Sequence, residues 1–138
     1  MAISLLGSLY GQQDNDDKPT TITYAEAEIL VYLTPAAQQV RSEGFDVGFD
    51  HTTSAKLNQS DYFFFYVFNS KRPSFGSVTV GHYAVNKHTA DVWDEGAETT
   101  LSSPELDGVQ KILRTAHHIN EQTVREFRPR PRDAIGPK

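Results

Sequence analysis

The longest hydrophobic run in this chain is Tyr62–Phe68, seven consecutive aromatic or aliphatic residues. A solvent-facing strand would alternate with polar residues, so an unbroken run predicts a strand in the middle of a sheet with both faces covered. Because neighbouring strand residues point to opposite faces, we expect Phe63, Phe65 and Val67 to lie together under the helices.

Three further segments have strand patterns. Phe45–Thr53 alternates between apolar and polar positions, which is typical of a half-buried antiparallel strand. Ser77–Asn86 and Thr89–Asp94 are predicted to pair as a hairpin around the polar turn Asn86–Thr89. With the aromatic run, these segments predict about four antiparallel strands.

A helix is predicted to begin after Thr23, because Thr23 and Glu26 have the spacing of a capping box. Pro35 cannot continue a helix, and Thr34 before it suits a new N-cap with proline in the first turn. We therefore expect a break at Thr34 and a second helical piece that ends before Gly44.

A C-terminal helix is predicted to begin at Pro104, after two serines that suit an N-cap. Its apolar positions recur with a period of 3.6 residues, while Lys111 and Arg114 are expected on the solvent side. Asn120 is the expected start of a final helical turn. The apolar stripe consists of Leu106, Val109, Leu113 and Ala116, with Ile112 beside it.

This order of elements predicts an α+β fold, in which an antiparallel sheet of about four strands packs against N-terminal and C-terminal helices on one face. We expect residues 1–21 to be an N-terminal segment with an acidic linker, residues 22–127 a single α+β domain, and residues 128–138 a basic tail rich in proline and arginine.

Composition and charge exclude some classes of function. The 138-residue chain has no cysteine and a formal net charge of −5. From Arg125 onward it carries five basic and two acidic residues, against eight basic and sixteen acidic residues before that point. An acidic body argues against nucleic-acid binding, and no apolar run reaches the ~20 residues of a membrane span.

The absence of cysteine fits a cytoplasmic protein. Ala2–Leu9 resembles the apolar part of a signal peptide but lacks a basic start. It is either an ordered segment that packs on the domain or the remnant of an export signal. In the second case the protein is periplasmic or secreted.

The histidines do not form a metal site in this pattern. His117 and His118 are neighbours near a helix end, where a cap is the expected role, and Asp50 and His51 point to opposite faces of a strand. His82 is expected either to face inward or to be turned outward by a bulge at Gly81. We predict no metal, no cofactor and no catalytic residue.

An acidic cluster on and after the last strand is the candidate partner-binding feature. Clustered acids beside an aromatic anchor are what a basic protein surface would meet. The predicted partner-binding residues are Phe75, Asp91, Trp93, Asp94, Glu95 and Glu98.

The hairpin sequence GHYAVNKHTADVW, residues 81–93, resembles a pattern found in PepSY-like domains and in NTF2-fold-type bacterial immunity proteins. The resemblance implies a cystatin/NTF2-like arrangement and a non-enzymatic binding or inhibitory module. It covers the hairpin and the first helix. Ala90 stands where the family has glycine, and because alanine resists a left-handed conformation we expect this turn to be built differently.

The leading hypothesis is an immunity or inhibitor protein that neutralises a bacterial toxin or effector with a basic surface. The sequence leaves open whether the protein also forms a homodimer. The first alternative is a small-ligand-binding or enzymatic cone-shaped domain, in which a curved sheet encloses a pocket lined by Tyr62, Tyr66, His82, Tyr83 and Trp93. The second is an exported PepSY-like modulator of a peptidase or an envelope protein.

Overall fold

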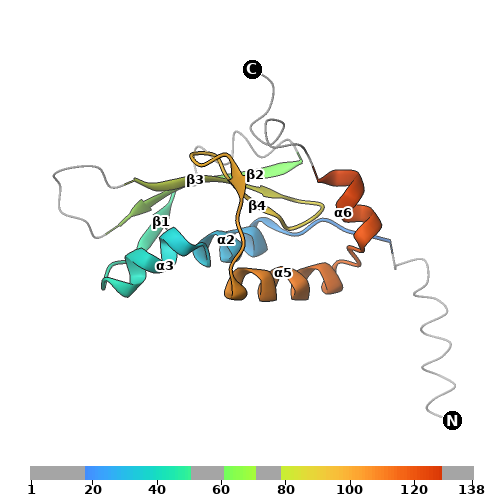
Figure 1. Cartoon of the computed structure of the whole chain (residues 1–138), viewed down its shortest axis with the longest axis horizontal. Coiled ribbons are helices and arrows are strands. Elements are labelled where there is room, and N and C mark those ends of the chain that lie inside the picture. Colours follow the sequence, from blue (N-terminus) through green and yellow to red (C-terminus); the bar gives the residue numbers. More distant parts are fainter. Residues whose placement is uncertain (1–17, 51–60, 71–78, 129–138) are drawn as a thin grey trace, which may run out of the picture.

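The computed structural model describes residues 18–50, 61–70 and 79–128. These residues form four helices and a five-stranded antiparallel sheet (Figure 1). The predicted α+β class is therefore confirmed, with five strands in place of four. Ala2–Leu9, His51, Phe75 and most of the basic tail lie outside the described residues.

The N-terminal helices begin and end where the sequence predicts. Helix α2 covers Tyr24–Tyr32, and both bonds of the Thr23–Glu26 capping box are present, at 2.8 and 3.1 Å. Helix α3, Pro35–Ser42, restarts with Thr34 as its N-cap residue. Gly44 follows it with φ +90°, a left-handed conformation that glycine adopts without strain.

The sheet is a meander. Its strands are β1 (Val47–Phe49), β2 (Tyr62–Asn69), β3 (Thr79–Asn86), β4 (Val92–Asp94) and β5 (Thr99–Thr100), in sequence order, each antiparallel to the next. Strand β2 pairs on both sides, as predicted for the aromatic run. Strand β4 is shorter than the predicted segment Thr89–Asp94, and β1 begins two residues after Phe45, while residues 51–53 of the predicted first strand lie outside the described residues.

One irregularity interrupts the pairing of β2 with β3. Val67 pairs with Gly81, whereas Phe68 pairs with Thr79, so β3 has an extra residue at Val80. A Cβ at Gly81 would lie 2.8 Å from the Tyr83 hydroxyl oxygen, closer than van der Waals contact permits. Of the two arrangements weighed for this segment, the bulge is the one present.

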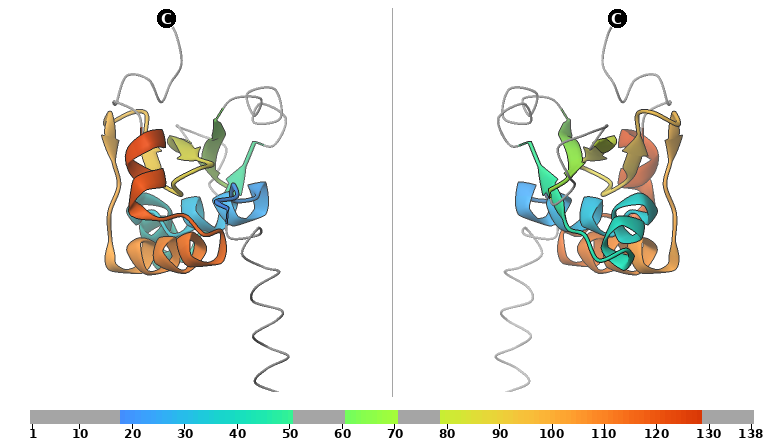
Figure 2. Two further views of the ribbon diagram at one scale, coloured as in Figure 1. Left: turned by 90° about the vertical axis from the view of Figure 1, so that its right-hand side faces the viewer. Right: turned by 90° about the vertical axis from the view of Figure 1, so that its left-hand side faces the viewer.

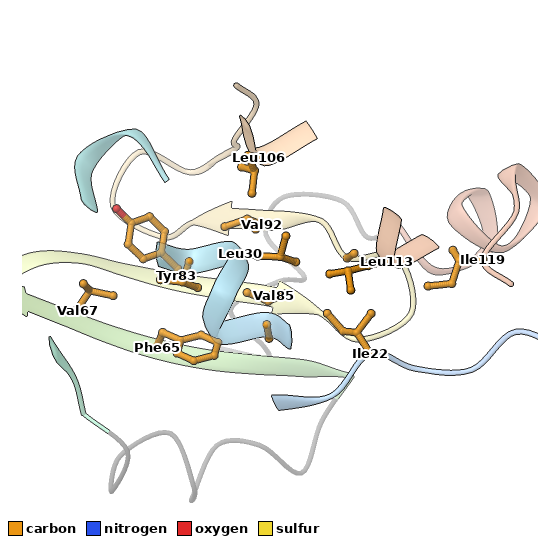
Figure 3. Close-up of a cluster of buried hydrophobic side chains, with 13 residues drawn as sticks. Ile22, Leu30, Phe65, Val67, Tyr83, Val85, Val92, Leu106, Leu113 and Ile119 are labelled. Atoms are coloured by element: carbon orange, nitrogen blue, oxygen red, sulfur yellow. The ribbon is translucent and has the colours of Figure 1, made fainter. Parts of the chain in front are cut away.

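The hydrophobic core lies between one face of the sheet, here called the inner face, and helices α2 and α5 (Figures 2 and 3). Phe65 on β2 is only 2% exposed, and its strand partner Tyr83 is equally buried. Phe63 packs against the same core and is half-buried. The predicted placement of Phe63, Phe65 and Val67 under the helices is therefore confirmed.

The C-terminal part contains helix α5 (Pro104–Ala116) and helix α6 (Glu121–Phe127), with Ser103 and Asn120 as N-cap residues. Helix α6 covers the end of the sheet at the β3–β4 turn (Figure 1). Three details differ from the predicted stripe, the first being that Ala116 is exposed. Ile112 is 67% exposed, and Arg114 is not on the solvent side, because it reaches the β3–β4 turn instead.

Ala90, in that turn, adopts the left-handed conformation that we expected alanine to avoid, with φ +66°. Hydrogen bonds explain why. The Asn86 side-chain oxygen accepts from the His88 and Thr89 amides, the Ala90 amide donates to the Asn86 carbonyl at 2.9 Å, and the Ala90 carbonyl accepts from Gln110. These bonds fix the backbone and outweigh the modest cost of a left-handed alanine.

Candidate protein-binding surface

The described helices leave one face of the sheet without a helix on it (Figure 2). On this outer face, β2 and β3 present side chains that pair across the strands, including Tyr66 opposite His82. Three aromatic residues there are only half-buried, which corrects the expectation that both faces of β2 are covered. We define the outer sheet face by Phe64, Tyr66, Phe68 and His82.

These side chains partly cover one another. The Tyr66 ring lies 4.8 Å from the His82 ring and 6.1 Å from the Phe68 ring, between ring centroids. The Tyr66 hydroxyl is 2.7 Å from the Thr79 hydroxyl. His82 itself is exposed. Rings that contact one another at a tilt, with one hydroxyl held by a hydrogen bond, form a preorganised apolar surface, which reduces the entropy lost when a partner binds.

Trp93 lies at the base of this face and is not an exposed anchor. It packs with Tyr62 and Ala84 in a second small cluster, at 5% exposure. Its indole N–H has no hydrogen-bond acceptor among the described residues. Trp93 is therefore part of the packing beneath the outer face, and its ring is not available as an exposed anchor for a partner.

The four residues considered for a pocket do not line one cavity. Tyr62, Tyr66 and His82 belong to the outer face, whereas Tyr83 points into the core on the inner face. Burial raises the pKa of the Tyr83 hydroxyl, which therefore stays protonated at neutral pH.

The four acids proposed for partner binding are also divided. Asp91 precedes β4 and is 8% exposed, because Arg114, Arg128 and Thr89 all donate hydrogen bonds to its carboxylate. It cannot contribute to an exposed acidic strip. Asp94, Glu95 and Glu98 lie at the other end of β4, around the β4–β5 turn.

Within this turn the carboxylates have distinct roles. Asp94 Oδ1 accepts from the Gly96 and Ala97 amides at 2.9 and 3.1 Å and so holds the turn. Glu95 is half-buried beside His82. Burial raises the pKa of Glu95, with His82 opposing this shift and Asp94 adding to it. Glu98 is exposed.

Sequence reasoning missed a cleft between α5 and α6. It has a volume of about 370 Å³ and is open to solvent. Arginines dominate its polar lining, which no periodicity in the sequence revealed because they come from two helices and a helix end. The lining residues are Arg114, Ile119, Asn120, Glu121, Val124, Arg125 and Arg128.

His117 has a larger role than the predicted cap. It is the C-cap residue of α5, and its ring nitrogens lie 2.8 Å from Thr20 Oγ1 and 2.8 Å from Glu26 Oε1. The same Glu26 oxygen accepts from the Thr23 amide. One histidine therefore joins the C-terminal helix to the segment that leads into α2.

Two properties of residues 18–50, 61–70 and 79–128 concern metal ions and membranes. These residues contain no group of three or more histidine, aspartate or glutamate side chains placed to hold a metal ion. They also contain no helix long and apolar enough to cross a membrane.

Comparison with known proteins shows a fold likeness. The chain is similar to a chain in the structure of a type VI secretion system effector–immunity complex from Pseudomonas protegens, with a TM-score of 0.59 and 16% identity. The match covers 78% of this chain and 87% of that one. No protein-family model matches the sequence, and no curated protein matches it either.

Proposed function

We propose that this protein is a non-catalytic binding module of the immunity type, which neutralises a toxin or effector by covering part of its surface. The observation that carries the proposal is the outer sheet face, a preformed aromatic surface on the side of the sheet without a described helix. The fold likeness to a chain of an effector–immunity complex supports it.

The outer sheet face has the composition of an interface centre. Aromatic residues are enriched at the energetic hot spots of protein interfaces, because they bury a large area at a small cost in conformational entropy. Tyr66 and His82 offer two rings in contact, and Phe64 and Phe68 extend the apolar area along β2. The polar tips of Tyr66 and His82 can also hydrogen-bond with a partner.

The charge around this face favours a basic partner. Glu95 adjoins His82, and Glu98 lies exposed in the turn beside it. With the net charge of −5, these carboxylates attract a positively charged surface and speed its association. We therefore propose that Glu95 and Glu98 lie at the rim of the interface, outside the aromatic centre.

The test uses the protein encoded by the neighbouring gene as the candidate target. Co-expression of this chain should relieve growth arrest caused by that protein, and the purified pair should bind. The double variant Tyr66→Ala with His82→Ala removes the centre of the outer sheet face. It should weaken binding by a factor of about 30 or more, the ~2 kcal/mol typical of a hot spot.

The matched control is Ile112→Ala, which removes an exposed apolar side chain from α5, on the other side of the sheet. It should leave binding unchanged. Full rescue and unchanged affinity in the double variant, with folding intact by circular dichroism, would show that the outer sheet face is not the interface. A candidate target that neither binds nor is relieved would count against the function itself.

A further inference from the structure

The cleft between α5 and α6 has an excess of positive charge in an acidic protein. Arg114, Arg125 and Arg128 line it, with Glu121 as the acid among its lining residues. Asp91 lies behind two of these arginines. Even counting Asp91, three guanidinium groups face two carboxylates, so one positive charge is left without a compensating acid at this place.

Two of these arginines already bind a carboxylate within the protein, that of Asp91. Arg128 donates from both Nε and Nη2 to the two oxygens of Asp91, at 3.0 Å each. Arg114 donates from Nη2 to the same carboxylate and from Nε to the Thr89 carbonyl. A guanidinium has five N–H donors, so each of these arginines retains donors beyond those used in its described bonds.

Arg125 is the arginine with the weakest tie. Its Nη1 lies 3.9 Å from Glu121 Oε2, and its side chain is 70% exposed. An exposed ion pair of this length contributes little to stability. Arg125 can therefore turn toward a ligand in the cleft without breaking an internal contact of consequence.

The walls of the cleft indicate what kind of anion fits. Ile119 and Val124 contribute apolar surface beside the arginines. A bare inorganic ion gains nothing from apolar walls, whereas a carboxylate on an aliphatic stem fits both the charge and the lining. The volume of about 370 Å³ also exceeds the space that a single carboxylate needs.

We propose that this cleft binds a glutamate or aspartate side chain of a partner protein, with Arg125 and the free donors of Arg114 and Arg128 as its ligands. The inference goes beyond the proposed function because the cleft is separate from the outer sheet face. It can be tested with a peptide, so its failure and the failure of the immunity hypothesis are distinguishable.

The experiment is a titration of the full chain followed by ¹⁵N NMR. The ligand is an acetylated and amidated peptide in which one glutamate is flanked by leucines. Parallel titrations use the same peptide with glutamine in place of glutamate, glutarate, and inorganic phosphate. Saturable shifts should map to α6 and the end of α5, and the glutamine peptide should bind about tenfold more weakly or not at all.

Two variants separate the cleft from general electrostatics. Arg125→Gln removes a cleft arginine that does not contact Asp91, and it should weaken binding of the glutamate peptide about tenfold. Lys111→Gln removes the same charge from an exposed position on α5 and should leave affinity unchanged. Equal effects of the two variants would overturn the proposal. So would an absence of saturable binding, or phosphate or glutarate binding as tightly as the peptide.

Discussion

Asp91 and Arg128 are joined by two parallel hydrogen bonds of 3.0 Å each, which tie the end of α6 to the start of β4. The same carboxylate accepts from Arg114 at 3.0 Å and from the Thr89 hydroxyl at 2.7 Å. One buried acid thus connects the β3–β4 turn, α5 and the residue after α6. Arg128 therefore belongs to the folded structure, although the sequence suggested that the basic tail begins there.

We predict that Asp91→Ala lowers the free energy of unfolding by about 2–4 kcal/mol, because it leaves the half-buried Arg114 without its carboxylate. Urea denaturation measures the loss. Glu98→Ala, which removes an exposed carboxylate a few residues away, should stay within ~0.5 kcal/mol of the wild type. Similar losses in both variants would mean that Asp91 contributes only surface charge.

Adjacent phenylalanines on β2 offer a matched pair for the inner and outer faces. Phe65 is 2% exposed in the core, so Phe65→Ala should cost about 3–5 kcal/mol in urea denaturation. Replacing Phe64, its half-buried neighbour on the outer sheet face, by alanine should lower the free energy of unfolding clearly less. A loss below about 1 kcal/mol for Phe65→Ala would place this residue outside the core.

The Glu26–His117 contact makes stability depend on pH. Burial acts to raise the pKa of Glu26, but hydrogen bonds from Thr23 and His117 and the His117 charge outweigh it, so the pKa is lowered from 4.5. A lowered folded-state pKa contributes stability that is present above 4.5 and is lost as pH falls through the folded-state value.

We therefore expect Glu26→Gln to be less stable than the wild type at neutral pH. The two proteins should converge at the acid end, where Glu26 is protonated in both the folded and the unfolded state. Thermal unfolding across the pH range measures this difference. A gap between the two melting curves that stays constant down to the acid end would exclude ionisation of Glu26 as its cause.

The sequence predicted the features that depend on neighbouring residues, namely the helix starts and the alternation along β2. The capping box at Thr23, the restart at Pro35 and the serine cap before Pro104 all lie where expected, because each depends on residues within one helical turn. The inner-face positions of β2 were predictable for the same reason, since alternation along a strand is local.

The candidate site was less predictable because its contacts are distant in sequence. Asp91 looked like a surface acid, yet its partners Arg114 and Arg128 lie 23 and 37 residues further along the chain. Trp93 looked like an anchor for a partner, yet pairing with Ala84 places it in a buried cluster. Neither the spacing nor the composition of the hairpin contains this information.

Three acidic residues, Asp94, Glu95 and Glu98, lie around the β4–β5 turn at the rim of the proposed interface. Asp94 holds the β4–β5 turn through two amide hydrogen bonds, so reversing its charge would disturb the turn as well as the field. Glu95→Lys combined with Glu98→Lys is the cleaner variant. Against a basic target it should slow association several-fold at low ionic strength, and the effect should shrink as salt is added, because screening weakens steering. Stopped-flow association rates measure this.

The control is Glu43→Lys combined with Glu105→Lys, which makes the same change in net charge at two exposed positions on other elements. If the control slows association equally, net charge alone attracts the target, and Glu95 and Glu98 have no special place at the rim.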